Sequence, residues 1–255
     1  MDDRTKKWQE RTALLLGDDK VRALSGKHIL IAGLGGVGGY AAEILTRAGI
    51  GNLTIVDQDI IQPSNINRQL IATHSNIGKR KSEEIEKRLK DINPLINIKV
   101  LSTFLKDENI PQLLGECDYD FVVDAIDTIS PKVYLIKTAI DRNIPIVSSM
   151  GAGAKTDPMS IRVNYLSKSY NCTLAKVIRK RLRKIGVRED IMVVFSNEMQ
   201  DKSAVKEIEG ETCKRSTAGT ISYMPALFGC HIGAYVINCL IKNICDVHNY
   251  SKEYN

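Results

Sequence analysis

The stretch His28-Ile-Leu-Ile-Ala-Gly33-Leu-Gly35-Gly36-Val-Gly38, followed by a helical pattern from Tyr40 to Gly49, decides the fold. The run before Gly33 is apolar on both faces, which predicts a buried strand of a parallel sheet. Glycine is needed where the turn after this strand is tight and where backbone must approach a phosphate without a Cβ in the way. The helix that follows offers free N–H groups and the positive end of its dipole. We therefore expect Gly33, Gly35, Gly36 and Gly38 to form a phosphate-binding loop.

Short β-type runs and helical patterns alternate through the first 150 residues. Further strands are expected at Leu53–Asp57, Ile96–Leu101, Asp120–Asp124 and Ile144–Ser149, and helices at Lys79–Asp91 and Pro131–Arg142. Alternation of this kind predicts a mostly parallel sheet with helices on both faces. The expected fold class is therefore α/β and Rossmann-like.

The pattern weakens after Gly153, where we expect the same sheet to continue with insertions. Strands are predicted at Ile161–Tyr165 and Ile191–Phe195, a polar stretch at Ser196–Thr217, and an uncharged buried helix near Tyr223–Lys242. The expected organisation is a helical N-terminal segment (1–26), a nucleotide-binding core (27–153), and a C-terminal part of the same domain (154–255).

Charge is distributed unevenly along the 255 residues. The chain has 36 Lys and Arg against 30 Asp and Glu, and 43% hydrophobic and 26% charged content excludes gross disorder and a polytopic membrane protein. Nine basic residues and no acidic one lie between Pro158 and Arg188, which leaves 27 basic and 30 acidic residues elsewhere. The chain is therefore a mildly acidic body with one strongly basic segment.

The six cysteines include no C-x-x-C pair, and the charged N-terminus MDDRTKKWQERT lacks the apolar region of a secretion signal. Reduced thiols and a cytoplasmic location are therefore expected. Ser216–Ile241 carries no charge, but its polar residues, Pro225 and glycines favour a buried core helix over a membrane span. Peripheral membrane contact stays open.

The residues after the second expected strand point away from simple dinucleotide binding. Asp57, 19 residues past Gly38, is placed to bind a ribose, and the fingerprint alone suggests a nicotinamide-dependent dehydrogenase. Hydride transfer has no use for Arg68 and Lys81 beyond the ribose, whereas adenylation needs cations for the α-phosphate and the leaving pyrophosphate. It also needs a carboxylate for Mg²⁺, which Asp124-Ala-Ile-Asp127 supplies. Each of these charges alone fits a solvated surface, but their joint place at strand ends favours a site.

Five motifs occur in order between Lys27 and Gly153: G-x-G-G-x-G, V-D-x-D, S-N-x-x-R-Q, I-G-x-x-K and D-x-x-D. Together they resemble the adenylation domain of the ubiquitin-activating (ThiF- and MoeB-like) enzyme superfamily. The resemblance implies carboxylate adenylation with ATP and Mg²⁺, on a homodimer. By it, Asp57 would bind the ribose and Asp127 the magnesium; the remaining nucleotide-site residues would be Asp59, Asn65, Arg68, Gln69 and Lys81, of which Asn65, Arg68 and Lys81 contact the phosphates. Arg11 falls where family members send an arginine into the partner's ATP site.

The second half of the chain separates the branches of that superfamily. Members that activate sulfur carriers usually have two C-x-x-C pairs, which this chain lacks. Gly151-Ala-Gly-Ala-Lys-Thr-Asp157-Pro158 and Leu174-Ala-Lys-Val-Ile-Arg-Lys-Arg-Leu-Arg-Lys184 instead resemble the tRNA threonylcarbamoyladenosine dehydratase branch. That branch implies ATP-dependent cyclisation of a modified adenosine in tRNA, by adenylation of its threonyl carboxylate.

The basic segment independently favours a polyanionic partner. Apolar residues recur at helical spacing and predict a buried stripe of Leu174, Val177, Ile178, Leu182 and Ile185. The tRNA-binding face would then consist of Lys176, Arg179, Lys180, Arg183 and Lys184, because neutralised phosphates release counterions. A solvated surface helix or a helix on an anionic membrane are the alternatives. Tyr165 and Tyr170 are the nearest residues for base stacking, unless they belong to the core.

Three other functions stay open on the sequence: adenylation of the C-terminus of a ubiquitin-like sulfur carrier, a non-catalytic nucleotide-binding scaffold, and, more distantly, a dehydrogenase. Ring closure within one molecule gains from proximity and needs no protein nucleophile. Cys213 could still form a transient thioester, or be an ordinary loop thiol. A protein that transfers or accepts sulfur is a further candidate partner.

Overall fold

One seven-stranded sheet organises the protein, for which the computed structural model describes residues 7–207 and 216–242. The strand order is β3-β2-β1-β4-β5-β7-β6, in which the first six strands are parallel and β6 runs antiparallel to β7 at the edge. The strands are β1 (His28–Ala32), β2 (Asn52–Val56), β3 (Asn97–Leu101), β4 (Phe121–Asp124), β5 (Ile146–Ser149), β6 (Ile161–Tyr165) and β7 (Met192–Ser196).

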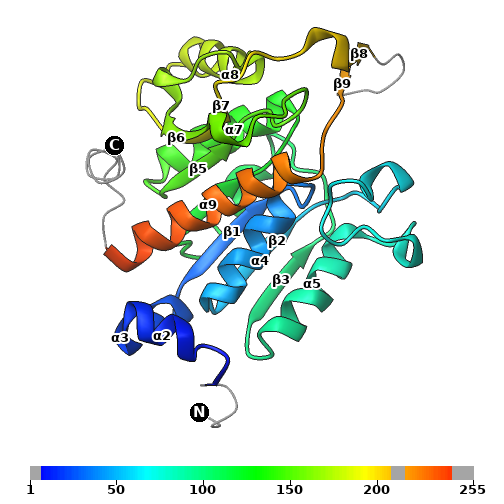
Figure 1. Cartoon of the computed structure of the whole chain (residues 1–255). Helices are drawn as coiled ribbons and strands as arrows, with labels where there is room; N and C mark the ends of the chain where they lie inside the picture. Colours follow the sequence, from blue (N-terminus) through cyan, green and yellow to red (C-terminus); the bar gives the residue numbers. More distant parts are fainter. Residues whose placement is uncertain (1–6, 208–215, 243–255) are drawn as a thin grey trace.

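Helices cover both faces of the sheet, as the alternating pattern predicts. The helices are α2 (Glu10–Leu16), α3 (Asp18–Ser25), α4 (Gly38–Ala48), α5 (Lys81–Ile92), α6 (Ile110–Leu113), α7 (Ile129–Asp141), α8 (Thr173–Lys184) and α9 (Tyr223–Lys242). Side chains of α4, α5 and α9 share one core cluster, and those of α6, α7 and α8 share the other. Figure 1 shows α9 lying beside α4 on the near side of the sheet.

The first strand is buried on both faces because it lies in the middle of the sheet. Ile29 and Ile31 contribute to the cluster under α4 and α9, whereas Leu30 and Ala32 contribute to the cluster under α7 and α8. Period-two alternation of side chains along a strand sends successive residues to opposite faces. A continuous apolar run therefore identifies a strand with helices on both sides.

The order in which the chain lays down its strands changes side at β1: β2 and β3 lie on one side of β1, and β4 and the later strands lie on the other. β1 pairs with β2 on one side and with β4 on the other, so the loops that leave β1 and β4 diverge at their carboxyl ends. In open α/β sheets, ligands bind in the crevice at such a switch point. The glycine loop follows β1, and the Asp124–Asp127 segment follows β4, so both face this crevice.

The second half of the chain completes the same sheet, which confirms that prediction. β7 pairs with β5 in parallel. β6 is the antiparallel edge strand and pairs with β7 over five residues, from Ile161↔Ser196 to Tyr165↔Met192. The boundaries at residues 26 and 153 stay predictions.

The final helix is a core element. Ten residues of α9 are buried, and a Cβ on Gly233 would lie 2.5 Å from Cγ2 of Ile44, so small residues let α9 approach α4 closely. By length and composition α9 could cross a membrane, yet 56% of its apolar window is buried inside the protein. The predicted core helix is therefore present, with the predicted bounds.

Several elements differ from the sequence-based expectation. The helix expected from Lys79 begins at Lys81, because Arg80 is extended and forms an isolated bridge with Ile60. The polar stretch holds part of a two-stranded sheet of β8 (Val205–Glu207) and β9 (Ser216–Ala218), and α6 was also not expected. Elements of three or four residues carry too little periodicity to be read from the sequence.

Candidate active site

The glycine loop between β1 and α4 folds tightly over its first residue. A Cβ on Gly38 would lie 1.8 Å from the Gly33 carbonyl oxygen, and one on Gly33 would lie 2.7 Å from the Ala125 carbonyl oxygen. Gly33 also has a φ of +89°, a conformation that L side chains rarely adopt. Only glycine fits at either position. Because α4 begins at Gly38, the first N–H groups of that helix lie at the loop.

The carboxylate of Asp57, directly after β2, braces this loop. Its Oδ2 accepts the N–H of Leu34 at 2.7 Å, and its Oδ1 accepts the N–H of Asp59 at 2.8 Å. Burial raises the pKa of the Asp57 carboxyl, while the cation of Lys81 and these two N–H groups act in the opposite direction. The carboxylate therefore lies against the loop, where a ribose hydroxyl could also donate to it; that role stays a prediction.

Lys81, the first residue of α5, is buried and paired. Its Nζ lies 2.8 Å from Oδ2 of Asp59, and its own N–H donates to the Asp59 carbonyl oxygen at 3.0 Å. The residue is only 5% exposed, although a lysine normally lies in solvent. The V-D-x-D and I-G-x-x-K motifs, far apart in sequence, are thus joined by one ion pair beside the glycine loop.

The S-N-x-x-R-Q motif forms another wall of the site around the glycine loop. Asn65 ends a short 3-10 helix, η1 (Pro63–Asn65), and its Oδ1 accepts the N–H of Gln62 at 2.9 Å. Asn67 donates from Nδ2 to the Thr220 carbonyl oxygen at 2.9 Å, which ties this wall to the segment before α9. Both asparagines therefore position the motif, and the contact of Asn65 with a phosphate stays a prediction.

Arg68 lies directly on the glycine loop and faces Asp127. A Cβ on Gly36 would lie 3.5 Å from Cγ of Arg68 and 2.9 Å from Cβ of Pro225. Nη1 of Arg68 donates to the Ser64 carbonyl oxygen at 2.7 Å and to Oδ1 of Asn67 at 2.8 Å. Burial lowers the pKa of this guanidinium, and the charge of Asp127 acts against the decrease. The structure thus brings one cation and one exposed carboxylate to the same side of the loop.

A buried ion pair fixes the segment that carries Asp127. Nζ of Lys132 lies 2.8 Å from Oδ2 of Asp124, and both side chains are 0% exposed. Lys132 also donates to the Ile126 carbonyl oxygen at 2.8 Å, and Oδ1 of Asp124 accepts the Ile126 N–H at 3.1 Å. Ser148 donates to Oδ2 of Asp124 at 2.5 Å. Every buried charge here is compensated, as a buried pair requires.

Sequence reasoning missed Lys132 and Ser148 and assigned the D-x-x-D motif only to magnesium. The structure divides the motif: Asp124 is the buried anchor, and Asp127 is the exposed carboxylate. The available signal was a lysine in an apolar helix, directly before Val133 and near Leu135 and Ile136. A cation on a buried helix face requires a buried anion nearby.

The residues at the loop fit a nucleotide. Gln69 is 7% exposed, and its buried Oε1 has no hydrogen-bond partner among the described residues. Its Nε2 lies 3.8 Å from where a Cβ on Gly35 would be, so the side chain borders the open side of the loop. An unsatisfied buried polar atom is costly unless a ligand completes it. A loop with four glycines among its six residues, with Arg68 beside it, is a suitable cradle for phosphate oxygens.

A magnesium ion would have to share its ligands with the nucleotide. Among the described residues, no group of three His, Cys, Asp or Glu side chains could hold a metal ion by itself. Mg²⁺ at phosphate sites usually takes one or two carboxylates and completes its shell with phosphate oxygens and water. Asp127 fits that single-carboxylate arrangement.

Arg11 lies at the opposite end of α4 from the loop of its own chain. Gln9 donates from Nε2 to the Arg47 carbonyl oxygen at 3.0 Å, which fastens the start of α2 (Glu10–Leu16) to the C-terminal end of α4. The 11 residues of α4 separate the two ends by about 16 Å. The exposed Arg11 therefore does not join this site, and its predicted role requires a second copy of the chain.

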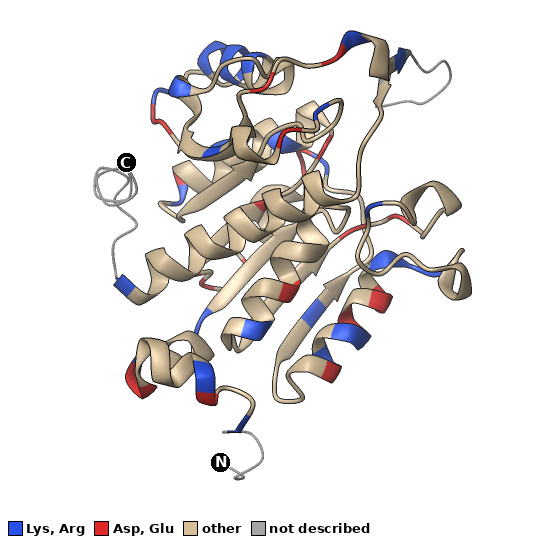
Figure 2. Cartoon of the chain, viewed as in Figure 1, with Lys and Arg blue, Asp and Glu red and all other residues tan. Residues whose placement is uncertain are grey.

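The basic face predicted for the segment after Tyr165 lies on α8, at the top of the molecule in Figure 2. Lys176, Lys180, Arg183 and Lys184 are exposed, and so is Arg181, which was not predicted. Arg179 is different, because its Nη1 donates to the carbonyl oxygens of Leu166 (2.8 Å) and Ser169 (2.6 Å). It fastens α8 to the preceding segment, so its guanidinium is already engaged, whereas the other predicted cations are exposed; the RNA-binding role of this face stays a prediction.

The predicted apolar stripe of α8 is largely present. Ile178 and Leu182 are buried with Ala175, and Leu174 and Val177 are partly buried. Ile185 was expected in the stripe but is 37% exposed, so that expectation is wrong. The helix ends at Lys184, and the stripe cannot continue past the last turn. Cys213 lies outside the described residues.

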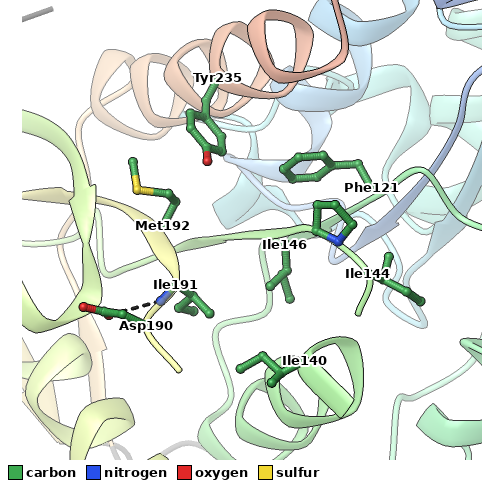
Figure 3. Close-up of a pocket in the computed structure, with 9 residues that line it drawn as sticks. Phe121, Ile140, Ile144, Ile146, Asp190, Ile191, Met192 and Tyr235 are labelled. Carbon is green, nitrogen blue, oxygen red and sulfur yellow. Dashed lines mark hydrogen bonds between the residues drawn. The ribbon is translucent and has the colours of Figure 1, made fainter. Parts of the chain in front are cut away.

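A small apolar cavity of about 160 Å³ lies far from this site. Figure 3 shows Phe121, Ile146, Ile191 and Met192 lining it, with Tyr235 of α9 above. These strand residues lie at or beside the amino ends of β4, β5 and β7, whereas the glycine loop follows the carboxyl end of β1. The cavity is therefore separate from the nucleotide site.

Fold and site together define a doubly wound nucleotide-binding protein whose phosphate loop is bordered by cations and a carboxylate. The model of the ThiF family matches residues 9–255, and the chain belongs to that family. It is 35% identical over 243 residues to a tRNA threonylcarbamoyladenosine dehydratase of Bacillus subtilis, covering 92% of this chain and 94% of the relative. It is 38% identical over 179 residues to an Escherichia coli protein of the same name, covering 69% of this chain and 66% of the relative.

A solved structure agrees over nearly the full length. The Escherichia coli tRNA N6-threonylcarbamoyladenosine dehydratase, TcdA, in complex with ATP has a TM-score of 0.87 and 31% sequence identity to this chain. The superposition covers 95% of this chain and 97% of that one. The predicted superfamily and fold are thereby confirmed.

The buried ion pair yields a test of the loop that it holds. Lys132→Met leaves Asp124 buried without its partner, so we expect a loss of about 3 to 5 kcal/mol in the free energy of unfolding. Adding Asp124→Leu should recover most of this loss, because no uncompensated charge remains. Lys132→Met removes the hydrogen bond to the Ile126 carbonyl oxygen, and the double variant also removes the one from the Ile126 N–H, so ATP binding should be weaker by about tenfold or more in each. Urea unfolding and calorimetric titration with ATP measure the two effects.

Ile110→Ala is the matched control. Ile110 is fully buried in α6, so its loss should cost about 2 to 5 kcal/mol without affecting affinity for ATP. Wild-type affinity for ATP in the double variant would contradict the role of the ion pair.

Proposed function

We propose that this protein uses ATP to dehydrate N6-threonylcarbamoyladenosine in tRNA to its cyclic form. The observation that carries the proposal is the joining of Arg68, Lys81 and Asp127 around one glycine loop, in a chain that matches dehydratase relatives over most of its length. The cations and the carboxylate are what adenylation requires and hydride transfer does not.

The loop and its walls divide the work of the first step. Gly33 to Gly38 and the start of α4 hold the phosphates, and Asp57 accepts from the ribose. A threonyl carboxylate oxygen attacks the α-phosphorus, and the bond to pyrophosphate breaks. Arg68 and Lys81 stabilise the charge that builds on the α-phosphate and the leaving group. Asp127 would hold Mg²⁺ together with the phosphates, and the bound ion would neutralise part of that charge.

The second step needs little from the protein. The carbamoyl group of the same nucleoside forms a bond to the activated carbonyl carbon, a proton is lost, and AMP departs with the former carboxylate oxygen. The nucleoside thus loses the elements of water. Because nucleophile and electrophile belong to one molecule, the reaction gains from proximity, and holding the substrate in place is sufficient.

The tRNA would be held by α8. Lys176, Lys180, Arg183 and Lys184 give this helix a cationic exposed face over a buried stripe. Such a face attracts phosphates through counterion release. The same charge also suits an anionic membrane surface, and peripheral association there is compatible with a cytoplasmic enzyme.

A homodimer is part of the proposal, because Arg11 can act at a nucleotide site only in a second copy. A sulfur-carrier protein as the adenylated substrate is the weaker alternative, since the relatives matched along the chain are named for the tRNA reaction. A protein that transfers or accepts sulfur is left as a further partner to test.

The function is tested by incubating tRNA that carries threonylcarbamoyladenosine with protein, ATP and Mg²⁺. We expect nucleoside mass spectrometry to show a product lighter by one water molecule, with AMP and pyrophosphate formed in equal amounts. Chelation of Mg²⁺ should stop the reaction. An unchanged nucleoside, or pyrophosphate exchange driven by a sulfur carrier in place of tRNA, would contradict the proposal.

Two substitutions test the assigned roles. Arg68→Ala and Asp127→Ala should each lower kcat by about 100- to 1,000-fold, as expected for a group that stabilises charge in the transition state. Arg80→Ala is the control, because Arg80 is an exposed cation just before α5 that pairs only with Glu83 among the described residues. Turnover at the wild-type rate in either variant, with an unchanged melting temperature, would remove that residue from the mechanism.

The basic helix is tested by salt dependence. Lys180→Gln with Lys184→Gln should flatten the plot of log Kd for tRNA against log salt by roughly 0.7 to 0.9 for each phosphate that the helix no longer neutralises. Lys87→Gln with Lys90→Gln removes the same charge from α5, on the other face of the sheet, and should leave the slope unchanged. Equal slopes in both pairs would exclude α8 from the interface.

A further inference from the structure

Polar side chains gather at the carboxyl ends of β5 and β7, in a place that the ATP site does not use. We call this group the Tyr170 surface, and it consists of Tyr170, Asn171, Thr173, Asn197 and Gln200. Two segments supply it: the residues that lead into α8 and the residues that follow β7. Hydrogen bonds join the two segments, so the surface is held as one unit.

Tyr170 is exposed but its ring is fixed. The residue is 54% exposed, while its ring forms a T-shaped contact with Phe195, with centroids 6.0 Å apart and an interplanar angle of 70°. Its Oη accepts a hydrogen bond from Nδ2 of Asn197 at 2.7 Å. A ring that is held by one aromatic neighbour and at its hydroxyl, and is still half exposed, keeps a face available to solvent. Such a face can stack on a base at low cost in conformational entropy.

The amide groups around Tyr170 match the edges of nucleobases. Asn171 donates from Nδ2 to the Asn197 carbonyl oxygen at 2.9 Å, and its φ of +53° presents the side chain from a tight bend. Thr173 donates to Oε1 of Gln200 at 3.2 Å. In the described part of the chain, Asn171 thus bonds through its nitrogen and Gln200 through its oxygen. The opposite atom of each amide is left for a ligand that both donates and accepts, as bases do.

The surface lies between the nucleotide crevice and the basic helix. Asn197 follows β7, which is three strands from β1, so it lies about 14 Å along the same edge from the glycine loop. α8 begins at Thr173 and carries its cations away from this edge over about 16 Å. Two acids adjoin the surface in sequence: Glu198 accepts the N–H groups of Thr156 and Asp157 at 2.9 Å, and Asp201 accepts the N–H of Ser203 at 2.9 Å. These carboxylates keep their charge, so the attraction of a polyanion has to come from the cations of α8.

We propose that the Tyr170 surface binds an unpaired base of the RNA substrate, next to the adenosine that reacts. Tyr170 stacks on this base, Asn171 and Gln200 contact its edge, and the adjoining phosphates follow α8. The inference rests on the proposed function for the identity of the RNA. It assigns base recognition to a surface distinct from both the ATP site and the cationic face.

The test uses an RNA hairpin with the sequence of an anticodon arm, in which 2-aminopurine replaces a loop purine beside the reactive adenosine. We expect the wild-type protein to quench its fluorescence by stacking. Tyr170→Leu keeps apolar packing on Phe195 but removes the aromatic face, so quenching should disappear and Kd should rise about 5- to 100-fold. Tyr170→Trp should keep the quenching and the wild-type Kd. The salt slope should match the wild type in every variant, because the cations that neutralise phosphates are unchanged.

Tyr134→Leu is the matched control, because Tyr134 is a 37% exposed tyrosine of α7, outside the Tyr170 surface. Equal quenching by the wild-type protein and by Tyr170→Leu, or no quenching by the wild type, would overturn the inference. Its failure differs from failure of the proposed function. If the protein converts the modified nucleoside but Tyr170→Leu has no effect on quenching, the proposed function stands and the role of the Tyr170 surface is contradicted. If the protein quenches the probe but does not convert the nucleoside, the proposed function is contradicted and the role of the surface stands.

Discussion

The contact between the turns after β1 and β4 is the constraint on which the rest of the site depends. The Ala125 carbonyl lies where a Cβ on Gly33 would be, and the Ala125 N–H bonds to the Ala32 carbonyl oxygen at 2.8 Å. The phosphate loop and the Asp127 segment are therefore one rigid unit, although about 90 residues separate them in sequence. The buried pair of Asp124 and Lys132 holds that unit from below by bonding both backbone groups of Ile126.

This arrangement explains which parts of the site could be predicted from the sequence. The glycines, Asp57 and the motif order follow from steric and electrostatic needs that are local to each strand end, so the sequence indicates them directly. The role of Lys132 could not be assigned in the same way. It depends on the carboxylate of Asp124, at the end of β4, which only the folded chain brings into contact with the Lys132 side chain of α7. Arg179 looks identical to its neighbours in sequence and differs only because η4 (Leu166–Lys168) and Ser169 offer it carbonyl oxygens. Tertiary partners, not residue type, separate an anchoring cation from an exposed one.

The distribution of charge now has a structural meaning. The body of the chain is nearly balanced, with 27 basic and 30 acidic residues outside the segment from Pro158 to Arg188, and Lys81 beside the glycine loop is paired with Asp59. The excess lies on the outer face of α8, where exposed cations have no acid on their own helix to neutralise them. Charge that is compensated inside the fold stabilises geometry, whereas charge left at the surface acts on partners at a distance.

In the proposed function, the chemistry and the choice of substrate use different parts of the sheet. The groups proposed to contact the phosphates follow β1, β2 and β4, and the loops after β1 and β4 have little freedom because glycine contacts and a buried ion pair fix them. β7, antiparallel β6 and α8 extend the same carboxyl edge and contribute a fixed aromatic ring, amide groups and a cationic helix. Adenylation of a carboxylate requires only that the carboxylate reach the α-phosphate, so the extension can be changed without altering the loop. Since any carboxylate could react there, substrate selection has to come from groups that recognise the remainder of the molecule. In this chain those groups are suited to RNA.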